Sequence, residues 1–187
     1  MKHFIITGAK HAGKTTYALK LKDILAFNCV SAGGFLCEGT FKEGQRDSFF
    51  IKSLLTYEKV LIADKNKSVD SKNYSFGSFT FYKKGFEFAY NEYEKSLLNK
   101  RKIIFIDEIG KWELEGGGFA ALFNKMPVQA VLAAVCRYDF VKDINSLFFN
   151  NNAEVINIDD DILLNAEKIK NHIYNEEICL ERKAGML

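Results

Sequence analysis

Apolar positions along this chain change their spacing repeatedly, and the changes separate two kinds of segment. Runs of consecutive or alternating apolar residues indicate strands, whereas apolar residues three or four positions apart indicate helices. Strand-like runs cover residues 3–8, 59–64, 76–82, 102–110, 128–136 and 153–159. Helical spacing covers residues 15–27, 85–100, 118–126, 141–149 and 160–177. Because the two kinds alternate, the pattern predicts βα units around a mostly parallel sheet.

Three segments add detail to this pattern. Residues 34–54 contain two alternating runs on either side of residues 42–45, which predicts an antiparallel hairpin. Residues 102–110 are almost continuously apolar, as is typical of a strand buried on both faces of a sheet. The last helix is expected to begin with Asp160 as its N-cap.

The composition is that of one folded domain with a sizeable core. Of the 187 residues, 48% are hydrophobic and 27% are charged, and there is one proline. We therefore expect a single domain over residues 1–187. The 26 basic residues nearly balance the 24 acidic ones, so the net charge is +2. This balance gives no reason to expect nucleic acid or an anionic membrane as a partner.

Cysteine and histidine usage bears on the cellular compartment. The four cysteines are far apart in sequence and form no C-x-x-C pair, and the three histidines are not clustered. This distribution favours a reduced protein and argues against a zinc site. The N-terminal apolar run is too short for a signal peptide, and no apolar segment reaches membrane-spanning length. We therefore expect a cytoplasmic protein.

Residues 8–15 read GAKHAGKT and match the phosphate-loop pattern G-x-x-x-x-G-K-[ST]. The glycines permit a tight turn whose N–H groups face a phosphate, and the following helix adds partial positive charge. Lys14 is expected to reach the β- and γ-phosphates, and the Thr15 hydroxyl to ligate Mg²⁺. The residues predicted to bind the nucleotide are Gly8, Ala9, Lys10, His11, Ala12, Gly13, Lys14, Thr15 and Thr16.

The position of this loop between a strand and a helix sharpens the fold prediction. We expect an α/β three-layer sandwich of the P-loop NTPase type, with a mostly parallel sheet plus an antiparallel hairpin. Lys10 and His11 occupy the middle of the loop. We expect them to face solvent at its outer edge, and the alternative is that their charge assists the phosphates.

An acidic pair, Asp107 and Glu108, stands where the strand-like run 102–110 ends. In an open α/β sheet this edge is the ligand edge, so both carboxylates should lie beside the phosphate loop. Asp107 is expected to hold the Mg²⁺ shell, and Glu108 to polarise an attacking water.

The same segment also reads as D-x-x-G, the second switch motif of GTPases. A GTPase needs N-K-x-D at a later strand end to select guanine. Residues 66–70, NKSVD, are one residue too long and precede the acidic strand, and residues 124–127, NKMP, lack the acid. A switch GTPase is therefore a minor alternative.

With these motifs in place, the chain resembles the THEP1-type nucleoside triphosphatases. The resemblance rests on residues 8–16, on Gly34-Phe35 with the turn at residues 44–46, and on residues 106–114, IDEIGKWEL. It extends from about residue 4 to residue 158 and implies slow, Mg²⁺-dependent hydrolysis of nucleoside triphosphates with broad base tolerance. Three positions depart from the family pattern: His11 replaces a loop glycine, Trp112 replaces methionine, and residues 115–119, EGGGF, replace a polar helix start.

Hydrolysis also needs positive charge against the transition state. Lys111 follows the acidic pair and is the first choice, with Arg46 on the hairpin and Arg137 at the end of a core strand as further choices. Trp112 could stack on a base or pack beneath a loop. Phe35 and Phe41 are expected to lie in the core.

These observations favour a nucleoside-triphosphate phosphatase in which Glu108, Lys14, Lys111 and Arg137 act in catalysis. One alternative is a P-loop kinase for a small acceptor, which would need an acceptor-binding acid and an arginine-bearing lid. Residues 146–154 contain no arginine, so no such lid is evident there. The other alternative is a nucleotide-dependent adaptor protein with an unknown protein partner.

Overall fold

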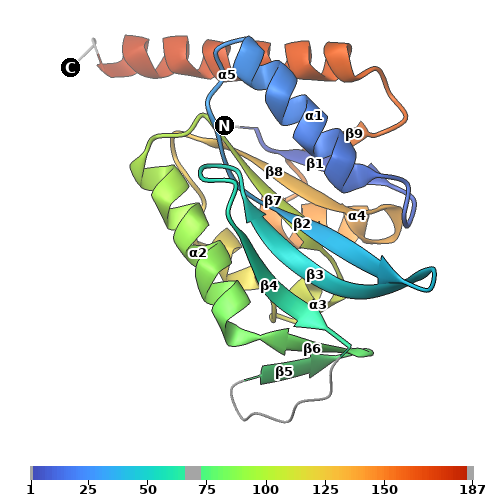
Figure 1. Cartoon of the computed structure of the whole chain (residues 1–187). Coiled ribbons are helices and arrows are strands. Elements are labelled where there is room, and N and C mark those ends of the chain that lie inside the picture. Colours follow the sequence, from blue (N-terminus) through green and yellow to red (C-terminus); the bar gives the residue numbers. More distant parts are fainter. Residues whose placement is uncertain (1, 66–72, 185–187) are drawn as a thin grey trace.

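The computed structural model describes residues 2–65 and 73–184 (Figure 1). The strands are β1 Phe4–Gly8, β2 Ala32–Lys42, β3 Gln45–Ser53, β4 Lys59–Asp64, β5 Asn73–Phe76, β6 Phe79–Tyr82, β7 Ile103–Ile109, β8 Val131–Arg137 and β9 Glu154–Asn157. The α-helices are α1 Lys14–Phe27, α2 Lys83–Leu98, α3 Lys111–Leu114, α4 Val141–Phe149 and α5 Ile162–Ala184. Two 3₁₀ helices are η1 Ala120–Lys125 and η2 Tyr138–Phe140.

All nine strands within the described ranges form one sheet, in the order β5-β6-β4-β3-β2-β7-β8-β1-β9. Strands β2, β7, β8, β1 and β9 pair in parallel, and we call them the parallel half. Strands β3, β4, β6 and β5 add to β2 by antiparallel pairing, and we call them the antiparallel half. The predicted fold class is confirmed, and its antiparallel part extends beyond the single expected hairpin.

Helices cover both faces of the sheet and make three layers (Figure 1). Alternate residues of one strand face opposite layers, as the period of two requires. In β1, Phe4 and Ile6 pack with the apolar faces of α1 and α5, whereas Ile5 packs with those of α2 and α4. Residues 103–106 of β7 are fully buried, because helices lie over both faces of this strand.

Three local predictions differ from the structure in detail, each for a short-range reason. The single strand predicted over residues 76–82 is interrupted, because β5 ends at Phe76, Gly77 turns the chain with a φ of 60°, and β6 begins at Phe79. Residues 118–126 contain the 3₁₀ helix η1, which stops at the extended residue that precedes Pro127. The N-cap of α5 is Asp161, whose Oδ1 accepts hydrogen bonds from the N–H groups of Leu163 and Leu164.

Some earlier expectations fall where the structure gives no description. The NKSVD segment at residues 66–70 lies outside the described residues, as does the side chain of Cys179. The other three cysteines are unpaired thiols. Within the described part of the chain, every helix is too short or too polar to cross a membrane.

Candidate functional site

The phosphate loop leaves β1 at Gly8 and enters α1 at Lys14. Gly13 makes this entry possible, because its φ of 92° lies in the left-handed region that favours glycine. No side chain caps α1, and no acidic residue lies in its first turn. The N–H groups of this first turn are therefore available to an anion, and the helix dipole adds positive potential there.

Lys14 lies folded against the loop, and its Nζ donates a hydrogen bond of 2.8 Å to the carbonyl oxygen of Ala9. Burial lowers the pKa of Lys14, against the opposing pull of Glu108 and Asp107. Lys10 and His11 are exposed, as expected, and they also line the cavity described below. His11 has a φ of 63°, which explains why the family pattern has glycine at this position.

Asp107 is buried at the end of β7 and connects three elements. Its Oδ2 accepts hydrogen bonds from the Thr15 hydroxyl at 2.8 Å and from the Cys37 N–H at 3.0 Å. Its Oδ1 accepts one from the N–H of Glu108 at 2.7 Å. Burial and the neighbouring Glu108 charge raise the pKa of Asp107 to about 7, against these hydrogen bonds.

Oxygen donors suit a hard divalent cation, and the Thr15 hydroxyl and the Asp107 carboxylate supply two of them side by side. These residue types fit Mg²⁺ well. The structure thus brings together the two residues that the sequence predicts as metal ligands, although they are 92 positions apart in the chain.

Glu108 follows Asp107 and is exposed where Asp107 is buried. Its backbone has a φ of 60°, which is uncommon for a residue with a side chain. The register between β7 and β8 shifts between Ile106 and Ile109, so the ladder is interrupted around Glu108. Glu108 therefore belongs to the end of a rigid strand without being part of its regular pairing.

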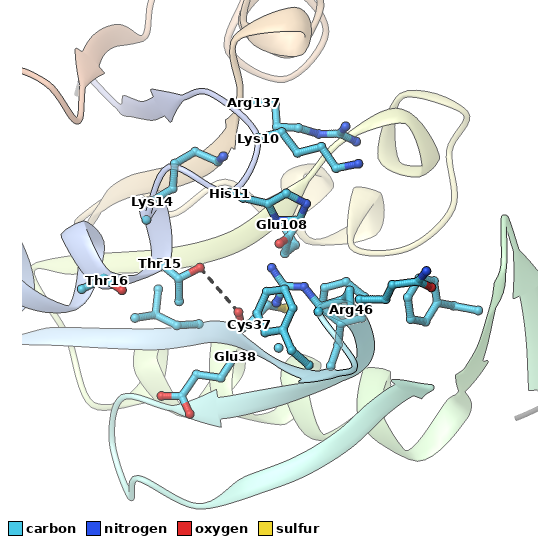
Figure 2. Close-up of a pocket in the computed structure, with 18 of the residues that line it drawn as sticks. Lys10, His11, Lys14, Thr15, Thr16, Cys37, Glu38, Arg46, Glu108 and Arg137 are labelled. Carbon is cyan, nitrogen blue, oxygen red and sulfur yellow. Dashed lines mark hydrogen bonds between the residues drawn. The ribbon is translucent and has the colours of Figure 1, made fainter. Parts of the chain in front are cut away.

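A cavity of about 940 Å³ lies between the phosphate loop and the β2–β3 hairpin, and we call it the phosphate cavity (Figure 2). Among its lining residues are Lys10, His11, Gly13, Lys14, Thr15, Thr16, Cys37, Gly39, Phe41, Arg46, Phe49, Glu108 and Arg137. Figure 2 shows cationic side chains approaching the cavity from both sides, with Lys10 and Arg137 opposite Arg46. The arrangement is suited to a polyanion.

Arg46 is held between two aromatic rings of the hairpin. Its guanidinium carbon lies 4.6 Å from the ring centre of Phe41 and 5.0 Å from that of Phe49. Its Nε is buried and has no hydrogen-bond partner among residues 2–65 and 73–184. Gly39 leaves room for the guanidinium, because a Cβ at that position would overlap one of its terminal nitrogens.

Phe41 corrects an expectation, because its side chain is 58% exposed and lies at the cavity rim. Phe35 is fully buried in the core, as predicted. Sequence reasoning missed Phe41 because an alternating strand pattern does not reveal that the hairpin extends beyond the helices that cover it.

Two further predicted cations have different surroundings. Arg137 ends β8, lies 5.0 Å from the ring centre of Phe140, and lines the phosphate cavity. Lys111 is exposed on α3, where its ammonium is 3.7 Å from the Glu115 carboxylate. The structure does not bring Lys111 to the phosphate cavity.

A second cavity of about 340 Å³ adjoins the first, and we call it the aromatic cavity. Its rings are Phe49, Phe76, Phe79, Phe81, Phe86, Trp112 and Phe119. Trp112 stacks on Phe76 with ring centres 5.4 Å apart. Glu113 also lines this cavity, and burial raises its pKa to about 7, although its carboxylate accepts hydrogen bonds from Gly110 and Phe119.

Comparisons with known proteins agree with this geometry. The sequence profile of the NTPase family matches residues 3–173. A protein named nucleoside-triphosphatase THEP1 from Saccharolobus solfataricus is 32% identical over 132 residues, which cover 68% of this chain and 73% of that protein. The alignment with the THEP1 of Methanopyrus kandleri is 26% identical and spans 62% of this chain and 61% of that protein's length.

Two solved structures have a similar fold. The crystal structure of THEP1 from the hyperthermophile Aquifex aeolicus has a TM-score of 0.61 at 27% identity, covering 84% of this chain and 90% of that chain. The solution structure of a human cancer-related nucleoside triphosphatase has a TM-score of 0.63 at 19% identity, covering 98% of both chains. The second likeness supports the fold alone.

Proposed function

We propose, from the premise that the chain belongs to the THEP1-type family of nucleoside triphosphatases, that it hydrolyses nucleoside triphosphates to diphosphate and phosphate. The observation that carries the proposal is the hydrogen bond between Thr15 and Asp107. It joins the uncapped N-terminus of α1 to the acidic end of β7, and Glu108 stands next to this junction.

In the proposed reaction, the N–H groups of residues 13–16 and the Lys14 ammonium bind the β- and γ-phosphates. Glu108 accepts a hydrogen bond from a water molecule and orients it toward the γ-phosphorus, with the leaving β-phosphate opposite. Thr15 and Asp107 would hold Mg²⁺, which when bound neutralises charge on the phosphate oxygens.

Positive charge from Arg46 and Arg137 completes this arrangement. Both side chains line the phosphate cavity, and neither has an acidic partner among the described ion pairs. A guanidinium with free donors is suited to the oxygens of a γ-phosphate. Lys111 is the weaker choice for this role, because it is paired with Glu115 outside the phosphate cavity.

We further propose broad base tolerance and slow turnover. Broad base tolerance is supported by the sequence, which has no guanine-selecting N-K-x-D after the acidic strand. Slow turnover is supported by the contacts of Arg46, because its stacking on two rings holds the guanidinium at one wall of a wide cavity.

Phosphate release tests this proposal directly. The purified protein is assayed with ATP, GTP, CTP, UTP and the deoxynucleotides in the presence and absence of Mg²⁺. We expect release from several nucleotides and none without Mg²⁺. Glu108→Gln should lower kcat roughly 10²–10⁴-fold while nucleotide binding is retained, because the side chain no longer accepts a proton.

Glu115→Gln is the matched control, since it changes an exposed glutamate of the same region that lines neither cavity. Its activity should equal that of the unmodified protein. Nucleotide binding without any phosphate release by the unmodified protein would contradict the proposal.

A further inference from the structure

The aromatic cavity has a defined position relative to the phosphate cavity. The two share six lining residues, namely Cys37, Phe49, Ser78, Phe79, Glu108 and Arg137. Lys14, Thr15 and Thr16 of the phosphate loop line the phosphate cavity alone. The aromatic cavity thus adjoins the phosphate cavity at Glu108 and Arg137, and no residue of the phosphate loop lines it.

This position argues against the nucleotide's own base as the natural occupant. The base is attached through the α-phosphate, at the opposite end of the triphosphate from the bond that is broken. In a displacement at phosphorus, the nucleophile enters opposite the leaving oxygen. If Glu108 orients the nucleophile, the space beyond Glu108 is on the side from which the nucleophile comes.

The size and lining of this space exceed what a water molecule needs. About 340 Å³ is within the range of small-molecule sites, and seven aromatic rings from the described residues surround it. Flat rings favour a flat heteroaromatic ligand by stacking. The charged side chains of its lining are Glu108, Lys111, Glu113 and Arg137, and two of them, Glu108 and Arg137, are shared with the phosphate cavity.

We propose that the aromatic cavity is an acceptor subsite, which binds a planar heteroaromatic alcohol and presents its hydroxyl to the γ-phosphate beside Glu108. The proposal rests on the function proposed above, because it uses the same phosphate site. Hydrolysis is then the reaction that takes place when water occupies the acceptor's position. A kinase needs positive charge near the transferred phosphate, and residues 146–154 contain no arginine that could supply it. In this protein Arg46 and Arg137 would supply it instead, since both line the phosphate cavity.

The transfer step balances without any further reactant. The acceptor's hydroxyl oxygen forms a bond to the γ-phosphorus, and the bond between that phosphorus and the β–γ bridging oxygen breaks. The nucleoside diphosphate leaves with the electron pair. The hydroxyl proton passes to the Glu108 carboxylate, and the products are a phosphate monoester and a diphosphate.

The first measurement is binding, and the chain offers its own probe. Trp112 is the only tryptophan of the protein and lines the aromatic cavity. The probes are adenosine, guanosine, cytidine, uridine, thymidine and pyridoxine, each a planar heterocycle with a hydroxymethyl group. At least one of these compounds should change the fluorescence of Trp112 saturably. It should do so both in the absence of nucleotide and when a β,γ-imido triphosphate occupies the phosphate cavity.

The second measurement is transfer. With γ-labelled ATP, the compound that binds should become labelled as its phosphate monoester, and release of free phosphate should fall correspondingly. Phe76→Ala removes the ring that stacks on Trp112, and it should weaken this compound's binding roughly tenfold. Phosphate release without the compound should be unchanged, because Phe76 does not line the phosphate cavity.

Tyr74→Ala is the matched control for this variant. Tyr74 lies on the same strand, and its ring centre is 6.1 Å from that of Trp112. Unlike Phe76, it does not line the aromatic cavity. Equal weakening by both variants would mean that the cavity wall has only been disordered, and it would overturn the proposal.

Two other results would overturn it as well. One is the absence of saturable binding by every probe. The other is competition between the probes and the imido triphosphate, which would mean that the cavity holds the nucleotide's own base. In either case, continued phosphate release that is sensitive to Glu108→Gln would leave the proposed hydrolysis standing, so the two failures are distinguishable.

Discussion

The parallel half and the antiparallel half of the sheet both contribute to the phosphate cavity, but in different ways. The parallel half contributes Lys10, His11 and Gly13 of the phosphate loop, the first turn of α1, and Glu108 near the end of β7. The antiparallel half contributes single side chains from separate strands and turns, such as Arg46, Phe49 and Phe79.

This difference concerns how each half recognises a ligand. In the parallel half, the proposed phosphate ligands are backbone N–H groups, and these depend on local chain geometry that a short motif encodes. In the antiparallel half the ligands would be side chains, and these come together only because four antiparallel strand pairs hold their strands in register. We therefore expect substitutions in the loop to abolish function and substitutions in the antiparallel half to modulate it.

The largest effect should come from the loop. Lys14→Ala removes the ammonium that is expected to bind the β- and γ-phosphates, so kcat should fall roughly 10²–10³-fold, as for other preorganised donors. Steady-state phosphate release measures this loss. A smaller loss than that of Arg46→Ala would contradict the proposed division between the two halves.

The next largest effect should come from Arg46. Arg46→Ala removes a guanidinium with an unpartnered donor, and hydrogen bonds to charged groups correspond to roughly tenfold to a hundredfold in kcat. Arg46→Lys retains the charge but not the planar stacking on Phe41 and Phe49. Activity equal to the unmodified protein in both variants would mean that the hairpin takes no part in the reaction.

Gly39→Ala tests the same contribution through packing alone. The new Cβ would overlap the Arg46 guanidinium and displace it, so kcat should fall about as far as in Arg46→Ala or less. The double variant should lose no more activity than Arg46→Ala, because both changes act on one group. Additive losses would assign Gly39 a separate role in the strand.

The smallest effect should appear in stability and should depend on pH. The pKa of Glu113 is about 7 in the folded protein, against an ordinary value of 4.5. Between these values the folded state retains a proton that the unfolded chain has released, so this group lowers the free energy of unfolding as pH rises. The effect at pH 8 is at most about 3 kcal/mol.

Glu113→Gln removes this dependence because the amide does not titrate. The Tm of the variant minus that of the unmodified protein should therefore increase between pH 5 and pH 8, in thermal unfolding scans. A difference that stays constant over this range would show that Glu113 is ionised throughout. Glu115→Gln, at an exposed position, serves as the control.

Sequence patterns predicted the parallel half well and the antiparallel half less well. The strand at residues 102–110 and the helix at residues 85–100 were found with nearly correct ends, because long apolar periodicity survives folding. The strand predicted over residues 76–82 includes β6 and the turn at Gly77 but misses β5, since the turn interrupts an otherwise aromatic run. Arg46 was named as a cation, but its stacking on Phe41 could not be expected.

The sequence by itself determined the phosphate loop, the succession of most strands and helices along the chain, and the acidic end of β7. These features are local, because hydrogen bonding within a turn and the periodicity of a strand depend on neighbouring residues. Only the tertiary structure decided that Thr15 would meet Asp107, and that Arg46 would lie opposite Arg137 (Figure 2). It also decided that seven rings from separate elements enclose a second cavity beside Glu108. Contacts of this kind depend on strand order and on packing of side chains distant in sequence, which no short motif specifies.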